Sequence, residues 1–309
     1  MSLFASDFSR ANAIRLPTAR DAERGAHSTR VLPAVQQRMV GPFVFLEQFG
    51  PTLFEAGRGF DMQPHPHLGL AAVTYLIDGE IVHRDSLGGV QTIRPGDVNW
   101  LTAGSGIVHS ERTSPEGRIS GSDFLGIQAW VALPSRFEEI DVNFAHHPAP
   151  EVPRLYDDGV EFTLIAGESN GLVAPVKTLS DLIYAEIVLT SGARYQARPE
   201  HIERAVYVIA GEVEIVGQAG MFAEGDLILL KPGAEVILRA PAFHAARLML
   251  LGGEPFPEPR YMDWNFVSSS PDRIEQAKTD WRERRFPDIP GEDDLIPYMS
   301  NNDRYEVAP

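Results

Sequence analysis

The sequence predicts an all-β protein made of two tandem β-barrels, followed by one short α-helix. Short apolar runs separated by Gly, Pro and Asp recur along the chain, and their length and β-branched content are typical of strands. Two of these runs, residues 72–81 and 204–215, resemble each other and indicate an internal repeat. Helical periodicity is largely missing before residue 270. The chain of 309 residues is about twice as long as a typical single domain, which agrees with two barrels.

Two turns mark corresponding points of the repeat. The dipeptides Asp78-Gly79 and Ala210-Gly211 are each predicted to close a β-hairpin, because such residues between apolar runs favour tight turns. When Gly79 is aligned with Gly211, a similar Gly-Asp pair follows each turn, at residues 96–97 and 225–226. The repeat therefore predicts two copies of one small barrel.

The segment HHPAPEVPR at residues 146–154 contains three prolines, which are typical of a linker. We expect three parts of the chain, a first barrel over 1–145, a second barrel over 146–262 and a C-terminal tail over 263–309.

The tail is predicted to contain one amphipathic helix over residues 271–285, which packs on the barrels. Ser270 and Pro271 suit the N-cap and the first helical position. The apolar side chains of the helix recur with helical spacing, at Ile274, Ala277 and Trp281. Two oppositely charged pairs can form along the helix, Glu275 with Lys278 and Asp280 with Arg284.

The composition limits the partners. The chain has 43 acidic and 27 basic residues and a net charge of −16, whereas binding to a phosphate backbone draws on Lys and Arg. Without cysteine, any metal must be held by nitrogen and oxygen ligands. No apolar stretch is long enough to span a bilayer, and the first residues lack the apolar core of a signal peptide. We expect a cytoplasmic protein that contacts neither membranes nor nucleic acid directly.

Four residues in two short segments are candidate ligands of one mononuclear metal. Residues i and i+2 of a strand point to the same face, so His65 shares a face with His67, and His109 with Glu111. A barrel that brings the two segments together would form a site of three imidazoles and one carboxylate. This donor set suits Fe(II), Ni(II), Mn(II), Cu(II) or Zn(II). A lone His-x-His pair is more often a surface feature, so the prediction depends on the surrounding sequence.

That surrounding sequence resembles the cupin superfamily and, within it, the pirin family of bicupins. Gly59 precedes His-x-His at the spacing of the first cupin motif, and a His follows the Gly-rich turn at 103–106 as in the second. HPHLGLAAVTYLIDGEIVHRDSLGG (65–89) and IRPGDVNWLTAGSGIVHSE (93–111) closely resemble the specific pirin signatures. The matching blocks cover roughly residues 30–135, and the second half resembles the pirin C-terminal domain in outline.

The resemblance implies two tandem cupin barrels of the double-stranded β-helix (jelly-roll) type. It also implies one divalent metal in the first barrel, with Fe(II) as the expected ion. The family's ligands fall on His65, His67, His109 and Glu111.

This chain departs from the pirin pattern at two places. Most pirins have a Glu that three or four residues separate from the second His, and those positions are Ala71 and Ala72 in this chain. Glu111 is then the only carboxylate expected on the metal. Glu47-Gln48 replaces a common Asp-His pair on a strand that is expected to border the pocket, so the substrate preference could differ.

The other histidines are expected to play no part in metal binding. His83 is predicted to have a structural hydrogen-bonding role together with Asp85, and His146 and His147 are predicted to be solvated linker residues. In the second barrel the His-x-His register falls near Ala197 and Pro199, so this barrel is expected to hold no metal. His201 and His244 are predicted to be loop or surface residues.

The resemblance implies flavonol (quercetin) 2,3-dioxygenase activity, in which O₂ opens the heterocycle of a small aromatic substrate with loss of carbon monoxide. Glu111 would be the catalytic base as well as a ligand. Two alternatives remain open at this point. One is a non-catalytic, iron-dependent regulatory protein that binds a protein partner, and the other is a metal-binding protein with an unrelated substrate. The sequence does not define the oligomeric state, although two barrels in one chain make a monomer plausible.

Overall fold

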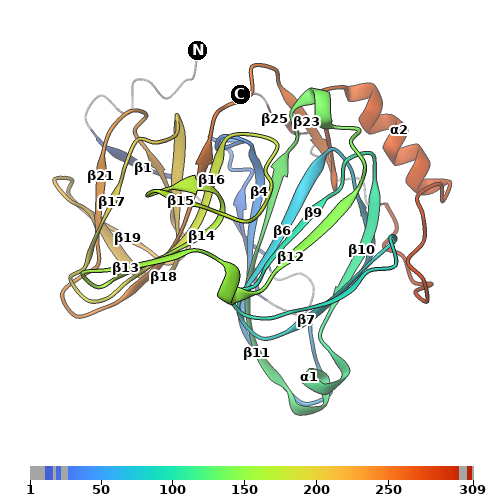
Figure 1. The fold of residues 1–309 in the computed structure, drawn as a ribbon, viewed down its shortest axis with the longest axis horizontal. Helices are drawn as coiled ribbons and strands as arrows, with labels where there is room; N and C mark the ends of the chain where they lie inside the picture. The colour runs from blue at the N-terminus through green and yellow to red at the C-terminus, as the bar shows by residue number, and fades with distance from the viewer. Residues whose placement is uncertain (1–10, 17–18, 22–26, 299–304, 308–309) are drawn as a thin grey trace.

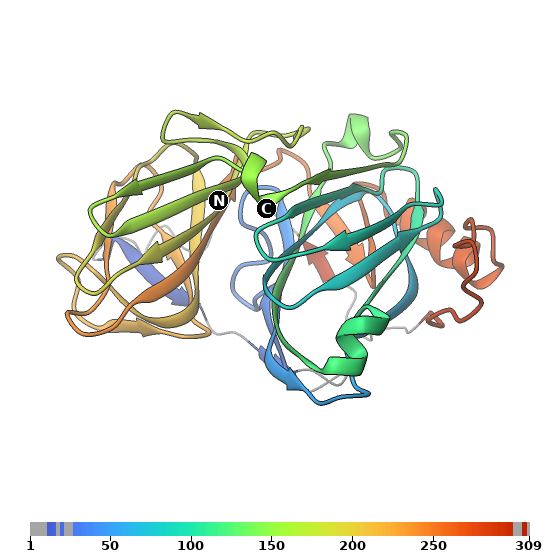
Figure 2. The same cartoon turned by 60° about the horizontal axis from the view of Figure 1, so that its bottom comes forward.

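The computed structural model describes residues 11–16, 19–21, 27–298 and 305–307, and it shows two β-barrels side by side (Figures 1 and 2). This confirms the all-β, two-barrel prediction. In the described ranges, the first barrel consists of a seven-stranded sheet facing a four-stranded sheet, and the second is formed by an eleven-stranded sheet. No helix within these ranges is long and apolar enough to cross a membrane.

The larger sheet of the first barrel has the strand order β12-β9-β6-β11-β4-β3-β2. In that order its strands span Asn143–His147, Val98–Thr102, Leu70–Asp78, Ser122–Ala132, Phe43–Phe54, Ser28–Leu32 and Ala19–Asp21. The smaller sheet has the order β5-β10-β7-β8. Its strands span Asp61–His67, Ile107–Arg112, Ile81–Asp85 and Val90–Ile93. The smaller sheet therefore carries both segments that contain the candidate ligands.

The second barrel is built on the strand order β1-β20-β18-β22-β16-β14-β13. These strands span Ala13–Leu16, Leu227–Leu230, Glu203–Ile215, Ala246–Gly253, Leu182–Leu189, Val160–Ser169 and Arg154–Asp157. Four short strands extend it, namely β15 (Leu172–Val173), β17 (Arg194–Ala197), β19 (Met221–Ala223) and β21 (Val236–Arg239). Strand β1 pairs with β20, so a strand from the start of the chain completes the sheet of the second barrel. The predicted limits of 1–145 and 146–262 assigned β1 to the first barrel, whereas it pairs with a strand of the second.

The C-terminal tail returns to the first barrel. It contains β23 (Arg260–Asp263), β24 (Phe266–Ser268), β25 (Tyr305–Val307) and the helix α2 (Pro271–Arg282). The apolar face predicted for the helix is confirmed, because Ile274, Ala277 and Trp281 pack in one cluster with Leu68 and Val108 of the first barrel. Figure 1 shows α2 beside β10.

The end of α2 differs from the prediction. The helix ends at Arg282 rather than at residue 285, and Arg284 adopts a left-handed backbone conformation with φ of 56°. Asp280 therefore pairs with Arg285, at 2.7 Å, and the predicted pair with Arg284 is wrong. The predicted pair of Glu275 and Lys278 is confirmed, at 2.9 Å.

The two predicted hairpins are wrong, because a barrel uses these glycines to change sheets. Gly79, with φ of 91°, leads from β6 in the larger sheet to β7 in the smaller one, so the two strands do not pair. Gly211 lies inside β18, where the register shifts after Val208 and the strand leaves β22 to pair with β19. In both barrels the turn residues bend the chain around a corner.

The linker begins later than the sequence suggested. His146 and His147 belong to β12, which pairs with β9, and both are partly buried. His146 Nδ1 lies 2.7 Å from Asn99 Oδ1. The prediction that these two histidines are solvated linker residues is therefore wrong, and the short 3₁₀ helix Ala149–Glu151 connects the barrels instead.

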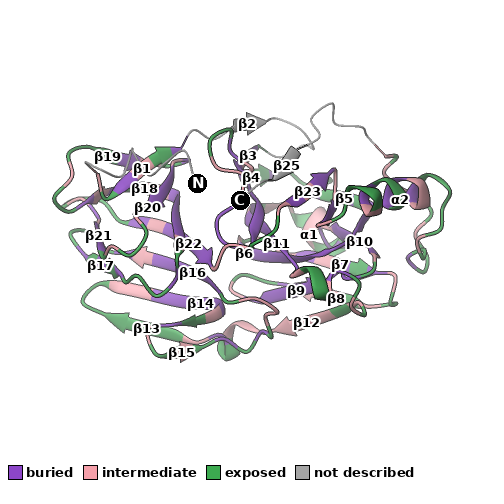
Figure 3. Ribbon diagram, turned by 90° about the horizontal axis from the view of Figure 1, so that it is seen from above, coloured by how far each residue is buried: buried purple, intermediate pink, exposed green. Residues whose placement is uncertain are grey.

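The two barrels share an extensive apolar seam. The outer face of β4, β6 and β11 packs against β16, β18 and β22, and this explains why β6 and β11 are buried on both faces (Figure 3). Two buried hydrogen bonds cross the seam, from Tyr75 Oη to Glu186 Oε2 at 2.8 Å and from Tyr207 Oη to Gln48 Oε1 at 2.9 Å. Gly41 allows close approach, since a Cβ there would lie 2.6 Å from Gly253 N. The second barrel thus braces the sheet behind the candidate site.

Candidate metal centre

The pairing of β10 with its two neighbours places the candidate ligands. His109 lies opposite His65 on β5, and Glu111 lies opposite His83 on β7. The β5–β10 register shifts between His109 and Glu111, which marks a bulge in the strand pair. All four side chains, and that of His67, are buried.

The structure brings the three predicted histidine ligands together. In the described part of the chain, His65, His67 and His109 can each place a ring nitrogen within 4.8 Å of the others. Glu111 belongs to an overlapping group with His109 and His83. The sequence analysis had not placed His83 at this centre. Its signal was the alternation of Ile81, His83 and Asp85 on one face of the neighbouring strand. The set of His65, His67, His109 and Glu111 as the metal ligands stays a prediction.

The hydrogen bonds of the imidazole rings leave lone pairs available for a metal. His65 Nδ1 lies 2.7 Å from the carbonyl oxygen of Gln63, so Nδ1 carries the proton and Nε2 has the lone pair. His109 Nε2 is buried without a hydrogen-bond partner among the described residues, and so is His67 Nε2. Buried nitrogens of this kind are costly unless something binds them. A divalent metal between the three rings fits this arrangement.

His109 is held by a chain of hydrogen bonds that leads away from the centre. The carboxylate of Asp85 accepts from His83 Nε2 at 3.0 Å, so His83 Nδ1 has the lone pair. That nitrogen lies 3.4 Å from His109 Nδ1, which then donates to it and keeps its proton on the side away from the metal. The hydrogen-bonding role predicted for His83 and Asp85 is confirmed.

Burial and mutual repulsion keep the rings neutral. Burial, followed by the proximity of His65, holds the pKa of His67 and that of His109 well below the ordinary value of 6.5. Burial alone would raise the pKa of Asp85, but the hydrogen bonds from His83 and from Gly89 N–H lower it. The rings of His67 and His109 are therefore unprotonated near neutral pH, as metal ligands must be.

Glu111 faces a small apolar cavity. Its Oε1 accepts from Thr74 Oγ1 at 2.6 Å, and its Oε2 lies 3.4 Å from Gln128 Nε2. Burial raises the pKa of Glu111, whereas nearby His83 and the Thr74 hydroxyl lower it in part. The cavity wall includes the rings of three phenylalanines, Phe49, Phe60 and Phe124. A single carboxylate therefore meets an aromatic-lined space.

The two departures from the pirin pattern occupy different environments. Ala72 faces the interior of the first barrel and pairs with Trp130, whose ring lies 5.0 Å from that of His67. Ala71 faces the seam between the barrels. Gln48 also points to the seam, where it bonds Tyr207. By strand alternation Glu47 shares the interior face of β4 with Phe49, which lines the cavity.

The corresponding region of the second barrel has no such group of histidines among its described residues. Ala197 packs in that barrel's apolar core, and Pro199 is exposed. His244 is an exposed loop residue, as predicted. His201 also lies in a loop, but its side chain is only 5% exposed, so it is not a surface residue.

We expect His83→Phe to weaken metal binding by about 10–100-fold, which is the usual effect of removing a residue that orients a ligand. The phenyl ring can still stack on Phe144, whose ring centroid lies 4.3 Å from that of His83, but it cannot accept the hydrogen bond from His109 Nδ1. Competition with a chelator measures the metal affinity. His146→Phe, a similar change on β12, is the matched control and should bind metal normally. Equal affinities for the wild type and His83→Phe would contradict this role.

Comparison with known proteins agrees with this architecture. Residues 25–131 match the family model described as Pirin, and residues 184–287 match the Pirin C-terminal cupin domain. A pirin-like protein from Caulobacter vibrioides is 48% identical over 84% of this chain and 90% of its own length. Pirin-1 of Arabidopsis thaliana is 32% identical over 84% of this chain and 88% of its own. The crystal structure of quercetin 2,3-dioxygenase from Acinetobacter baumannii is 32% identical, with a TM-score of 0.83 over 94% of this chain and 96% of that one.

Proposed function

Because the chain belongs to the pirin family, we propose that its first barrel is a metal-dependent flavonol 2,3-dioxygenase site of the quercetinase type. One observation carries the proposal. The buried carboxylate of Glu111 lies next to the cluster of histidines and also lines a cavity walled by phenylalanines. A similar structure, from Acinetobacter baumannii, is named as a quercetin 2,3-dioxygenase.

The residues present fit one mononuclear divalent metal. In this proposal His65, His67 and His109 hold it through ring nitrogens, and Glu111 supplies the fourth donor. Three imidazoles and a carboxylate suit Fe(II), which we propose as the native ion, but Ni, Mn, Cu and Zn bind such donors as well. The bound metal would supply Lewis-acid and redox chemistry for the reaction of the substrate with O₂.

The chain's own residues have three tasks in this proposal. Phe49, Phe60 and Phe124 line the apolar side of the small cavity at Glu111 and would limit the access of water to it. Glu111 accepts the proton of the flavonol 3-hydroxyl, since its carboxylate lies beside the histidines and lines the cavity. Thr74 holds the carboxylate in place through the hydrogen bond to Oε1. Loss of the hydroxyl proton makes the heterocycle electron-rich, which is the state that O₂ attacks.

The test is elemental analysis of the protein expressed with iron, combined with an aerobic assay on quercetin. We expect about one metal ion per chain, flavonol consumption that depends on it, and release of carbon monoxide. Removal of the metal with a chelator should abolish turnover, and adding Fe(II) back should restore it.

Bound metal without turnover on a panel of flavonols would overturn the proposal. If a specific protein partner were also recovered by pull-down, that result would favour the regulatory alternative, in which the same metal site controls a binding surface. Turnover that is independent of the metal would also contradict the proposal.

A further inference from the structure

A second group of side chains of the types that bind metals lies in the other barrel, away from the site described above. It consists of Asp181, His201 and Glu254, which can each place one ligand atom within 4.8 Å of the others. Asp181 directly precedes β16, His201 lies just before β18, and Glu254 directly follows β22. Because β22 runs antiparallel between β16 and β18, these three points meet at one end of the sheet.

The backbone at this end of the sheet holds the three residues in place. Leu182 and Glu203 both pair with Gly253, and Glu254 N–H extends the ladder by donating to the carbonyl oxygen of Asp181 at 3.1 Å. The N–H of Ile202 lies 3.4 Å from Glu254 Oε1, which keeps that carboxylate beside His201. The three residues lie just outside their strands, so the paired ends of these strands fix the backbone beside them.

His201 is the central observation. Its side chain is only 5% exposed, and its Nε2 lies 3.4 Å from the carbonyl oxygen of Glu168, to which it can donate a hydrogen bond. Its Nδ1 has no hydrogen-bond partner in the described part of the chain, yet it lies 3.4 Å from Asp181 Oδ1. With the proton on Nε2, the buried lone pair of Nδ1 faces the carboxylates of Asp181 and Glu254. A cation bound between these three acceptors would satisfy all of them.

From this geometry we infer that Asp181, His201 and Glu254 form a second divalent-cation site, which takes Zn²⁺ or an ion of similar preference. One imidazole and two carboxylates suit such an ion, and an exposed side leaves room for water as a further ligand. Ligands about 2.1 Å from a tetrahedral Zn²⁺ lie about 3.4 Å apart. The observed separation of His201 Nδ1 and Asp181 Oδ1 has this value.

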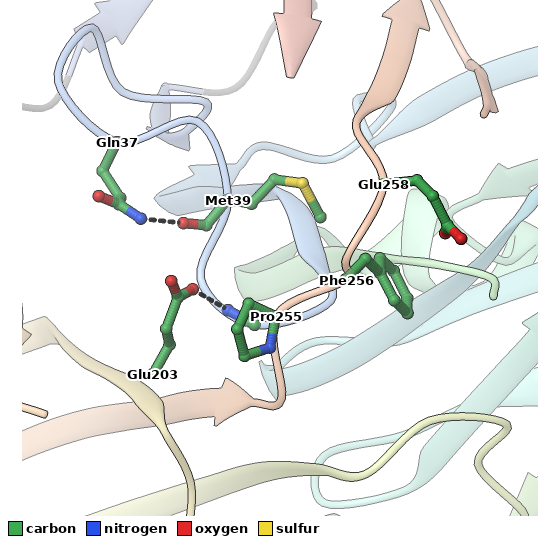
Figure 4. Close-up of a pocket in the computed structure, with 7 residues that line it drawn as sticks. Gln37, Met39, Glu203, Pro255, Phe256 and Glu258 are labelled. Atoms are coloured by element: carbon green, nitrogen blue, oxygen red, sulfur yellow. Dashed lines mark hydrogen bonds between the residues drawn. The ribbon is translucent and has the colours of Figure 1, made fainter. Parts of the chain in front are cut away.

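The surroundings add negative charge and connect this end of the sheet to the seam. Figure 4 shows Glu203 beside Pro255, the residue that follows Glu254, with the backbone of Gly41 donating to Glu203 Oε2 at 2.7 Å. Burial, with a contribution from Glu254, raises the pKa of Glu203. A bound cation would reduce repulsion among these carboxylates and stabilise the contact of β18 with the first barrel.

The test is a calorimetric titration of the metal-free, full-length chain with Zn²⁺. The first barrel also has donors for zinc, so we expect two ions per wild-type chain and one in the double variant Asp181→Asn, Glu254→Gln. Loss of a residue that orients a ligand lowers metal affinity by about 10–100-fold, and loss of two direct ligands should lower the affinity for Zn²⁺ by more than that. The double variant Asp157→Asn, Glu212→Gln removes two exposed carboxylates from the same barrel and should still bind two ions.

A second measurement needs no variant. In the wild-type protein, the Nδ1 nitrogen resonance of His201 should shift during the titration with Zn²⁺. Equal stoichiometries in the wild type and Asp181→Asn, Glu254→Gln, or a His201 resonance that stays unchanged throughout the titration, would each overturn the inference. Each result is independent of flavonol turnover, so failure here would leave the proposed activity of the first barrel untouched.

Discussion

Glu111→Gln should lose about 10²–10⁴-fold in flavonol turnover, the range that a positioned general base contributes. The amide has nearly the same shape and can still accept the hydrogen bond from Thr74, so the barrel should fold normally. It cannot accept the proton of the 3-hydroxyl. We expect the loss in kcat, measured with quercetin under air on protein of known metal content.

Two comparisons make this result specific to the carboxylate. Glu116→Gln changes an exposed glutamate of the short helix α1 (Pro115–Ser120), which follows β10, and should keep full activity. Metal analysis of Glu111→Gln separates the two roles of Glu111. If the variant keeps its metal but loses turnover, Glu111 acts as the base. If it loses the metal, Glu111 acts as a ligand. Full turnover of Glu111→Gln with any flavonol would rule out Glu111 as the base.

The sequence was sufficient for features that depend on strand alternation and on a local motif. His65 and His67 share a face because a strand alternates with period two, and the signature around His109 placed it on a second strand. The apolar face of α2 followed from its spacing alone. These features are encoded within a few neighbouring residues, so they need no knowledge of the tertiary structure.

Features that arise from closure of a barrel were not predictable in this way. A Gly at a hairpin and a Gly at a corner between sheets have the same local pattern, which is why Gly79 was assigned the wrong neighbours. The pairing of β1 with the second barrel depends on a partner far along the chain, β20, which the four residues of β1 do not specify. The closeness of His83 to His109 and the burial of His201 were not foreseen for the same reason, since their neighbours come from other strands.

The repeat allows the residues at the metal site of the first barrel to be compared with the corresponding residues of the second. In the alignment of Gly79 with Gly211, Arg204 takes the position of Ala72, one of the two positions at which the pirin pattern allows a glutamate. Its guanidinium is fully buried and donates to four backbone carbonyls, those of Ala197, Arg198, Lys231 and Ala234, at 2.7–3.0 Å. Ala197 falls at the register of the first histidine ligand. In the second barrel, the guanidinium of Arg204 thus connects the segments at residues 197–198 and 231–234. By the alignment, residue 197 corresponds to a proposed metal ligand of the first barrel.

We therefore expect Arg204→Met to lower the free energy of unfolding by about 3–5 kcal/mol, because methionine fills the space but leaves buried carbonyls without donors. Burial lowers the pKa of Arg204, but an arginine keeps its charge at any working pH, so the loss should not depend on pH between 6 and 9. Urea unfolding measures the change.

Arg198→Met removes an exposed guanidinium next to the same cluster and should change the free energy of unfolding by less than about 0.5 kcal/mol. If both variants unfolded at the same urea concentration, the guanidinium of Arg204 would not be what holds this end of the barrel together. Metal binding in the first barrel of folded Arg204→Met should remain unchanged, since no ligand comes from β18.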